Sequence, residues 1–85
     1  MEIVFTENAL EDLKYWKLSG NTKIQKRIQQ LLLSIQEAPF DGIGKPEGLK
    51  YNWAGYWSRR ITEEHRLIYK IEGEKIRVIQ LRDHY

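Results

Sequence analysis

The chain has 85 residues, of which 41% are hydrophobic and 31% are charged, with a formal net charge of +2 and no cysteine. This length allows one domain, residues 1–85, and the lack of cysteine excludes a disulfide framework and a thiolate zinc site. No apolar run approaches the ~20 residues that span a bilayer, and the first residues lack the pattern of a secretory signal. We therefore expect a cytoplasmic protein without membrane attachment.

The first part of the chain predicts a strand followed by a helix. Residues 2–5 contain a short β-prone run, and Thr6 is a residue type that caps helix N-termini. The sequence Ser-Gly-Asn at 19–21 ends the helical pattern. Between these signals, three apolar residues recur at helical spacing: Leu10, Leu13 and Trp16.

A second helix is predicted from Thr22 to about Glu37. Thr22 followed by Gln25 matches a capping box, and Pro39 disfavours helical backbone at Ala38. Apolar residues recur along one face of this helix: Ile24, Ile28, Leu31, Leu32 and Ile35.

The remainder of the chain predicts a loop and then strands. Residues 39–48 contain both prolines and three of the six glycines, and long loops of this kind often carry function. Strands are expected at 49–51, 56–61, 66–71 and 76–82, joined by short turns that require antiparallel neighbours. We therefore predict an α+β fold, with two N-terminal helices packed on one face of a twisted, mainly antiparallel sheet of four to five strands. The other face of the sheet stays open to a ligand.

Alternation along two of the strands indicates which basic side chains leave the core. Arg66 alternates with apolar residues of its strand. The side chain of Arg60 points to the other face of its strand from Trp57, which has the character of a core residue. Arg66 is therefore expected on the open face, where a guanidinium group can bind a phosphate through two hydrogen bonds. The alternative for Arg66 is a surface ion pair with Glu63 or Glu64.

Basic residues are concentrated between residues 44 and 70, with aromatic residues among them. This distribution fits a phosphate-binding face, and a solvated basic surface is the alternative. The cations in this stretch are Lys45, Lys50, Arg59, Arg60, Arg66 and Lys70, and the carboxylates are Glu47, Glu63 and Glu64.

Two side chains have the chemistry needed to cleave RNA through attack by its own 2′-hydroxyl, which requires a base, an acid and nearby cations. Glu47 lies in the loop between two lysines and is a candidate base, while His84 is a candidate proton donor. The alternatives are a solvated loop glutamate and an incidental surface histidine. Asp83, next to His84, either stabilises the charged imidazole or pairs with Arg82.

Other polar and aromatic clusters carry weaker signals. His65 with Glu63 and Glu64 resembles a metal site, but neighbouring residues of a turn rarely converge on one ion, so we expect no metal and no cofactor. Trp53 and Tyr56 are candidates for stacking on bases, with a place in the core as the alternative.

Three separated segments resemble a known family. They are Gly-Lys-Pro-Glu-Gly-Leu-Lys at 44–50, Trp-Ser-Arg-Arg-Ile-Thr-Glu-Glu-His-Arg-Leu-Ile-Tyr at 57–69, and His-Tyr at 84–85. In this order and at these distances they resemble the YoeB/Txe toxins of the RelE superfamily, and the likeness covers the whole chain. It implies a microbial-RNase-like fold and a ribosome-dependent endoribonuclease that cleaves mRNA in the ribosomal A site, thereby inhibiting translation.

The resemblance also implies roles for individual residues. It implies Glu47 as general base and His84 as general acid. Arg66 would be the main phosphate ligand, and Tyr85 would help to position the scissile nucleotide. Contacts with the RNA backbone are implied for Lys45, Lys50 and Arg60.

The partners implied by the resemblance are the ribosome and mRNA, a YefM/Axe-type antitoxin and a second copy of the chain. Operator DNA would be bound only through the antitoxin complex. The main alternative is a non-catalytic RNA- or ribosome-binding module that stalls translation. A protein-interaction domain acting in transcriptional control and a ribosome-independent RNase are further alternatives.

Overall fold

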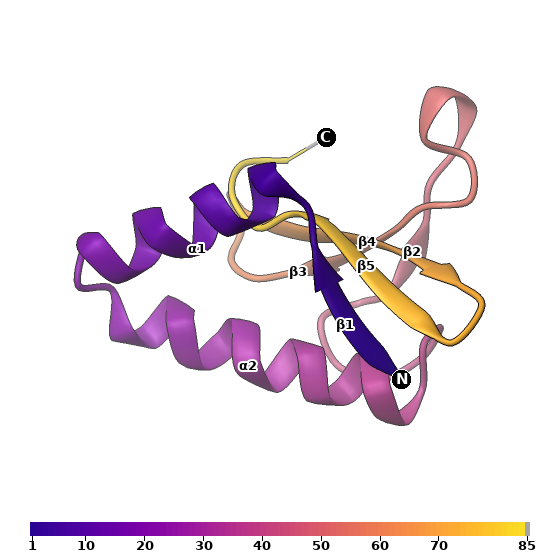
Figure 1. Cartoon of the computed structure of the whole chain (residues 1–85), viewed down its shortest axis with the longest axis horizontal. Helices are drawn as coiled ribbons and strands as arrows, with labels where there is room; N and C mark the ends of the chain where they lie inside the picture. The colour runs from indigo at the N-terminus through magenta and orange to yellow at the C-terminus, as the bar shows by residue number, and fades with distance from the viewer. Residues whose placement is uncertain (85) are drawn as a thin grey trace.

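The computed structural model describes residues 1–84, which form two helices and a five-stranded sheet (Figure 1). The strand order is β1-β5-β4-β3-β2, with β1 parallel to β5 and all other neighbours antiparallel. The α+β fold predicted from the sequence is confirmed. In chain order the elements are β1 (Glu2–Phe5), α1 (Glu7–Leu18), α2 (Thr22–Glu37), β2 (Glu47–Gly48), a 3₁₀ turn (Tyr51–Trp53), β3 (Trp57–Arg60), β4 (Arg66–Glu72) and β5 (Lys75–Gln80).

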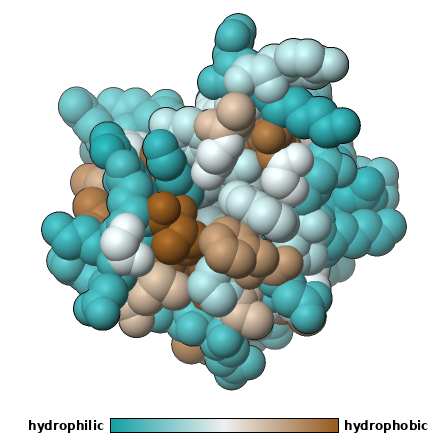
Figure 2. Space-filling model, turned by 90° about the vertical axis from the view of Figure 1, so that its right-hand side faces the viewer, coloured by the Kyte–Doolittle hydropathy of each residue, from teal (hydrophilic) through white to brown (hydrophobic). Residues whose placement is uncertain are grey.

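The core lies between the helices and one face of the sheet. In α1, Ala9 and Trp16 are buried and Leu13 packs against the core, whereas Leu10 is 53% exposed. The right-hand side of the molecule in Figure 1 is mainly hydrophilic around a small hydrophobic centre (Figure 2). The buried core cluster consists of Ala9, Trp16, Ile24, Ile28, Leu31, Ile35, Ile61, Leu67, Tyr69, Ile76, Val78 and Leu81.

The helix ends follow local capping chemistry. Thr6 caps α1 as predicted, accepting a hydrogen bond of 3.2 Å from a backbone N–H three residues later. The capping box predicted at Thr22 is wrong, because Asn21 caps α2 by accepting from Ile24 N at 3.1 Å and Thr22 is already helical. The predicted end at Glu37 is confirmed. Within residues 1–84, no helix is long and apolar enough to cross a membrane.

The pairing of β4 with β5 contains an irregularity that reverses the alternation of the last strand. Tyr69 pairs with Val78, but the preceding residue, Ile68, pairs with Gln80, so β5 carries one extra residue. After this bulge Leu81, rather than Gln80, turns into the core, where it is fully buried. The strand ends at Gln80, and the prediction that it continues for two more residues is wrong.

The strand predicted at 49–51 lies two residues earlier. Glu47 and Gly48 form β2, and Leu49 N still donates to Tyr56 O at 2.9 Å. Tyr51 has φ of 57°, a left-handed conformation that cannot continue a strand, and it opens the 3₁₀ turn instead. This connection between β2 and β3 projects from the body of the molecule (Figure 1).

Candidate functional site

Four of the predicted site residues meet in one cleft on the sheet face that points away from the helices. Glu47 lies opposite Ser58 on β3, and Arg60 on β3 lies opposite Arg66 on β4. Directly opposed residues share a face, and residues two apart on one strand also share a face. The cleft has a volume of about 220 Å³ and is lined by Lys45, Pro46, Glu47, Ser58, Arg60 and Arg66.

Arg66, which lines the cleft, is held by the turn that precedes β4. Its Nη1 donates to the carbonyls of Thr62, Glu63 and His65 at 2.7, 3.0 and 3.2 Å. Among residues 1–84 no ion pair joins Arg66 to Glu63 or Glu64, and no hydrogen bond from Nε or Nη2 is found. The Nε and Nη2 groups form one edge of the Arg66 guanidinium, and this edge can bind an anion such as a phosphate.

Arg59 and Arg60 divide between the two faces as the alternation predicted. Arg60 is exposed at the cleft, whereas Arg59 is fully buried. Arg59 donates to the Ser34 hydroxyl at 2.7 Å and to the Tyr69 hydroxyl at 3.2 Å. It also donates to three backbone carbonyls of the loop that follows α2, those of Ala38 (2.7 Å), Asp41 (2.7 Å) and Ile43 (3.1 Å).

The role of Arg59 was not found from the sequence. Alternation placed Arg59 on the core face of its strand. Its acceptors are hydroxyls and backbone carbonyls, and the charge pattern of the sequence would have indicated a partner only if that partner were a carboxylate. The three hydrogen bonds from Arg59 to the loop fix the course of the loop backbone toward Lys45 and Glu47. A further hydrogen bond of 2.7 Å, from Arg60 N to Gly44 O, attaches the end of this loop to β3.

Tyr69 completes the buried network around Arg59. Its hydroxyl donates to Pro39 O at 2.6 Å and accepts from Arg59 Nε. Burial raises the pKa of Tyr69 above its ordinary value, and the hydrogen bond and charge of Arg59 oppose this rise without cancelling it. The hydroxyl is therefore held in its neutral, hydrogen-donating form.

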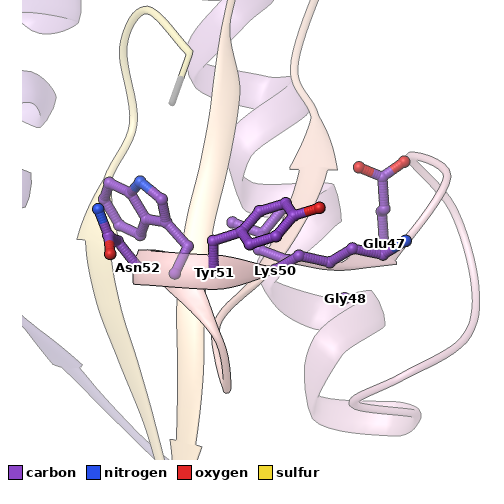
Figure 3. Close-up of a pocket in the computed structure, with 7 residues that line it drawn as sticks. Glu47, Gly48, Lys50, Tyr51 and Asn52 are labelled. Atoms are coloured by element: carbon purple, nitrogen blue, oxygen red, sulfur yellow. The ribbon is translucent and has the colours of Figure 1, made fainter.

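Lys50 lies outside the cleft, in a neighbouring hollow of about 620 Å³ lined by residues 47–53. In Figure 3 the Lys50 side chain extends toward Glu47, and the hydroxyl of Tyr51 points in the same direction. Tyr51 is 93% exposed. Glu47 lines both the cleft and this hollow, so it lies between the cations of the cleft on one side and Lys50 with the exposed Tyr51 ring on the other.

The aromatic residues predicted as candidates for base stacking lie near this hollow. Trp53, which lines it, packs edge to face on Tyr56 with ring centroids 5.5 Å apart. Lys70 Nζ lies 5.2 Å from the centroid of the Tyr56 ring. Trp57 packs against the core, as its assignment to the core predicted. Stacking of bases on Trp53 and Tyr56 stays a prediction.

The segment 81–84, called the tail below, does not continue β5, although the strand was predicted to run to residue 82. It bends at 81–83, and Asp83 adopts a left-handed φ of 62°. Asp83 O accepts from Arg66 N at 2.8 Å. This hydrogen bond attaches the tail to β4 at the residue before His84, which is exposed. The Asp83 carboxylate lies 3.8 Å from Arg82 Nε, in agreement with the pairing alternative. Tyr85 and its predicted role lie outside the described residues.

His65 is engaged in contacts that differ from those of a metal ligand. Its Nδ1 accepts from Asp83 N at 2.8 Å, and its ring packs edge to face on Trp16 with centroids 4.8 Å apart. In the part of the chain that the structure describes, no three His, Cys, Asp or Glu side chains are grouped closely enough to hold a metal ion.

Comparison with known proteins gives a family for the whole chain. Residues 5–85 match the model of the YoeB-like toxin of bacterial type II toxin-antitoxin systems. Toxin YoeB of Synechocystis is 49% identical over 85 residues, which cover 100% of this chain and 98% of the relative. Toxin YoeB of Escherichia coli K12 is 41% identical over the full length of both chains.

Solved structures agree with this sequence match. A YoeB/ParE toxin from Agrobacterium tumefaciens superposes with a TM-score of 0.96 at 41% identity, covering 100% of both chains. YoeB of Staphylococcus aureus, solved as a dimer, has a TM-score of 0.91 at 43% identity, covering 100% of this chain and 98% of that one. The same toxin was also solved in a complex with YefM, with a TM-score of 0.90.

Proposed function

Because the chain belongs to the family of YoeB-like toxins of bacterial type II toxin-antitoxin systems, we propose that it is a ribosome-dependent endoribonuclease that cleaves mRNA in the ribosomal A site and inhibits translation. The observation that supports this proposal best is the cleft itself. It combines the Glu47 carboxylate with the guanidinium groups of Arg60 and Arg66 on one open sheet face.

The proposed reaction begins with proton abstraction by Glu47 from the 2′-hydroxyl of the nucleotide before the scissile bond. The 2′-oxygen then attacks the phosphorus, and the extra negative charge of the phosphorane is stabilised by Arg66 and Arg60. His84 donates a proton to the departing 5′-oxygen. The products are a 2′,3′-cyclic phosphate and a free 5′-hydroxyl, and Tyr85 is proposed to position the scissile nucleotide.

The cations around this centre are proposed to bind the RNA backbone. Lys45 lines the cleft and Lys50 lines the adjoining hollow, on either side of Glu47. Acid, base and charge stabilisation are all supplied by side chains in this scheme. We therefore propose that the reaction needs no metal ion.

The partners follow from the relatives. YoeB of Staphylococcus aureus was solved as a dimer and in a complex with YefM. We propose that this chain is neutralised by an antitoxin of the YefM/Axe type, that it forms a homodimer, and that it reaches operator DNA only through the antitoxin complex.

Primer extension on a defined mRNA in a purified translation system tests the proposed function. We expect discrete cuts at A-site codons that require ribosomes, and a fall in cleavage rate of about 10²- to 10⁴-fold for both Glu47→Gln and His84→Gln. Glu74→Gln is the matched control, because Glu74 is exposed in the turn between β4 and β5. Arrested elongation on intact mRNA would contradict cleavage, and equal cutting of naked RNA would contradict ribosome dependence.

A further inference from the structure

We propose that His65 is a positioning residue for the reaction: its Nδ1 fixes the backbone at Asp83 and thereby holds His84 beside the cleft. This inference rests on the proposed function, in which His84 is the proton donor. His65 does not line the cleft and is not assigned a chemical role in the reaction.

The contacts at Asp83 fix both of the peptide planes that flank it. The plane between Arg82 and Asp83 carries the Asp83 N–H, which donates to His65 Nδ1 at 2.8 Å. The plane between Asp83 and His84 carries the Asp83 carbonyl, which accepts from Arg66 N at 2.8 Å. Because each peptide is planar, setting the two planes sets both φ and ψ of Asp83 and therefore the position of the His84 Cα atom.

The imidazole of His65 is itself held rigidly. Its ring stands edge-on to Trp16 at an interplanar angle of 79°, and its backbone N–H donates to the Thr62 hydroxyl at 3.1 Å. Trp16 Nε1 in turn donates to Leu81 O at 2.8 Å. Nδ1 accepts a hydrogen bond only when it carries no proton, so this contact sets the neutral tautomer with its proton on Nε2.

The same arrangement connects the tail to the cleft. Arg66 donates its backbone N–H to the tail, while its guanidinium lines the cleft with Glu47 and Arg60. The last residues of a domain are poorly ordered unless other elements hold them. The hydrogen bond from Asp83 to His65 is a side-chain contact that restrains the tail one residue before His84.

Two substitutions separate the hydrogen bond from the packing of the ring. In His65→Asn the amide oxygen occupies the place of Nδ1 and keeps an acceptor for Asp83 N. His65→Leu fills a similar volume against Trp16 without an acceptor. Glu64→Gln is the matched control, because Glu64 is an exposed neighbour in the same turn.

Single-turnover cleavage by the full chain on programmed ribosomes is the first measurement. A displacement of about 1 Å at a reacting group costs on the order of 10²-fold in rate. We expect His65→Leu to lower the cleavage rate constant about 10- to 100-fold while the half-saturating ribosome concentration changes less than about twofold. His65→Asn should recover most of the rate. Equal rates for wild type and His65→Leu, or an equal loss for both His65 variants, would overturn the proposal.

Amide hydrogen exchange of the free protein is the second measurement, and it does not depend on cleavage. We expect the Asp83 amide to lose protection in His65→Leu and to keep it in His65→Asn, with the amides of β4 unchanged in both. Loss of protection throughout β4 would show general unfolding and overturn a specific role. If wild-type protein does not cleave mRNA, the proposed function fails together with the catalytic part of this inference. Asp83 exchange still decides whether His65 holds the tail.

Discussion

Arg59 is a buried cation whose charge is balanced by dipoles rather than by a carboxylate. Its guanidinium group makes hydrogen bonds to Ser34, Tyr69 and three loop carbonyls. A planar group with five fixed N–H donors suits several acceptors at once, whereas the ammonium of lysine offers three donors from one point. The loop before the cleft therefore depends on an arginine at this position.

We expect Arg59→Met to lower the free energy of unfolding by about 3 kcal/mol, because it leaves buried acceptors without a donor. Arg60→Met, at the exposed neighbour on the same strand, should change stability by less than about 0.5 kcal/mol. Urea denaturation of both variants measures the difference. Equal stabilities of the two variants would contradict the structural role of Arg59.

The raised pKa of Tyr69 predicts a loss of stability in alkaline solution. In the folded protein the hydroxyl keeps its proton to a higher pH than in the unfolded chain. This contribution to stability is therefore fully present below the unfolded pKa, about 10, and is lost as pH rises through the folded value. Denaturation at a series of alkaline pH values should show a steeper decline for wild type than for Tyr69→Phe. Parallel declines would argue against a shifted tyrosine.

Among the elements, β2 brings Glu47 to the cleft by pairing it with Ser58 on β3. Gly44 allows the preceding loop to approach closely: its φ is 84°, and a Cβ there would lie 2.6 Å from Leu31 Cδ2. Gly73, in the turn between β4 and β5, also has a positive φ of 60°, but a Cβ there would have no heavy atom within 4 Å.

These two glycines form a matched pair for testing the loop. Both alanine variants incur a left-handed backbone cost of about 1 kcal/mol, and Gly44→Ala adds about 1–3 kcal/mol from crowding against the core. We expect Gly44→Ala to be clearly the less stable variant in thermal or urea unfolding. A larger loss for Gly73→Ala would contradict the close approach at Gly44.

The helices and four of the five strands were predictable because their signals are local. Caps, prolines and apolar periods mark where these elements begin or end. The bulge in β5 was not predictable, because one extra residue in a ladder depends on how two strands pack together. Capping of α2 by Asn21 was missed because Asn21 and Thr22 are adjacent residues of types that both act as caps.

The site was predictable in part for similar reasons. Alternation identified Arg60 and Arg66, since each lies on a regular strand. The meeting of Glu47 with these residues depends on a two-residue strand, which is too short to leave a periodic pattern. The place of His84 depends on contacts of Asp83 with His65 and Arg66, which no local pattern in the tail contains.

At the scale of the whole molecule, a net charge of only +2 conceals a local concentration of cations around the cleft. If Lys45, Lys50, Arg60 and Arg66 each neutralise a phosphate, log K for single-stranded RNA should fall with log salt with a slope of about −3. Lys45→Ala should weaken that slope by about 0.7, and Lys75→Ala, on β5, should leave it unchanged. The salt dependence of binding is measured by fluorescence anisotropy with a short oligonucleotide that lacks 2′-hydroxyls and therefore cannot be cleaved. Equal slopes for all three proteins would contradict the assignment.

The strand order has a consequence for how the chain folds as it is made. β1 is synthesised first, but its partner in the sheet, β5, is the last strand of the sequence, with Glu2 opposite Lys75 and Phe5 opposite Val78. Contacts so distant along the chain delay folding, because a long loop has to close before they form. The sheet thus becomes complete only after β5 has been synthesised. In a nascent chain the strands that carry the cleft, β2 to β4, therefore emerge before the strand that completes their sheet.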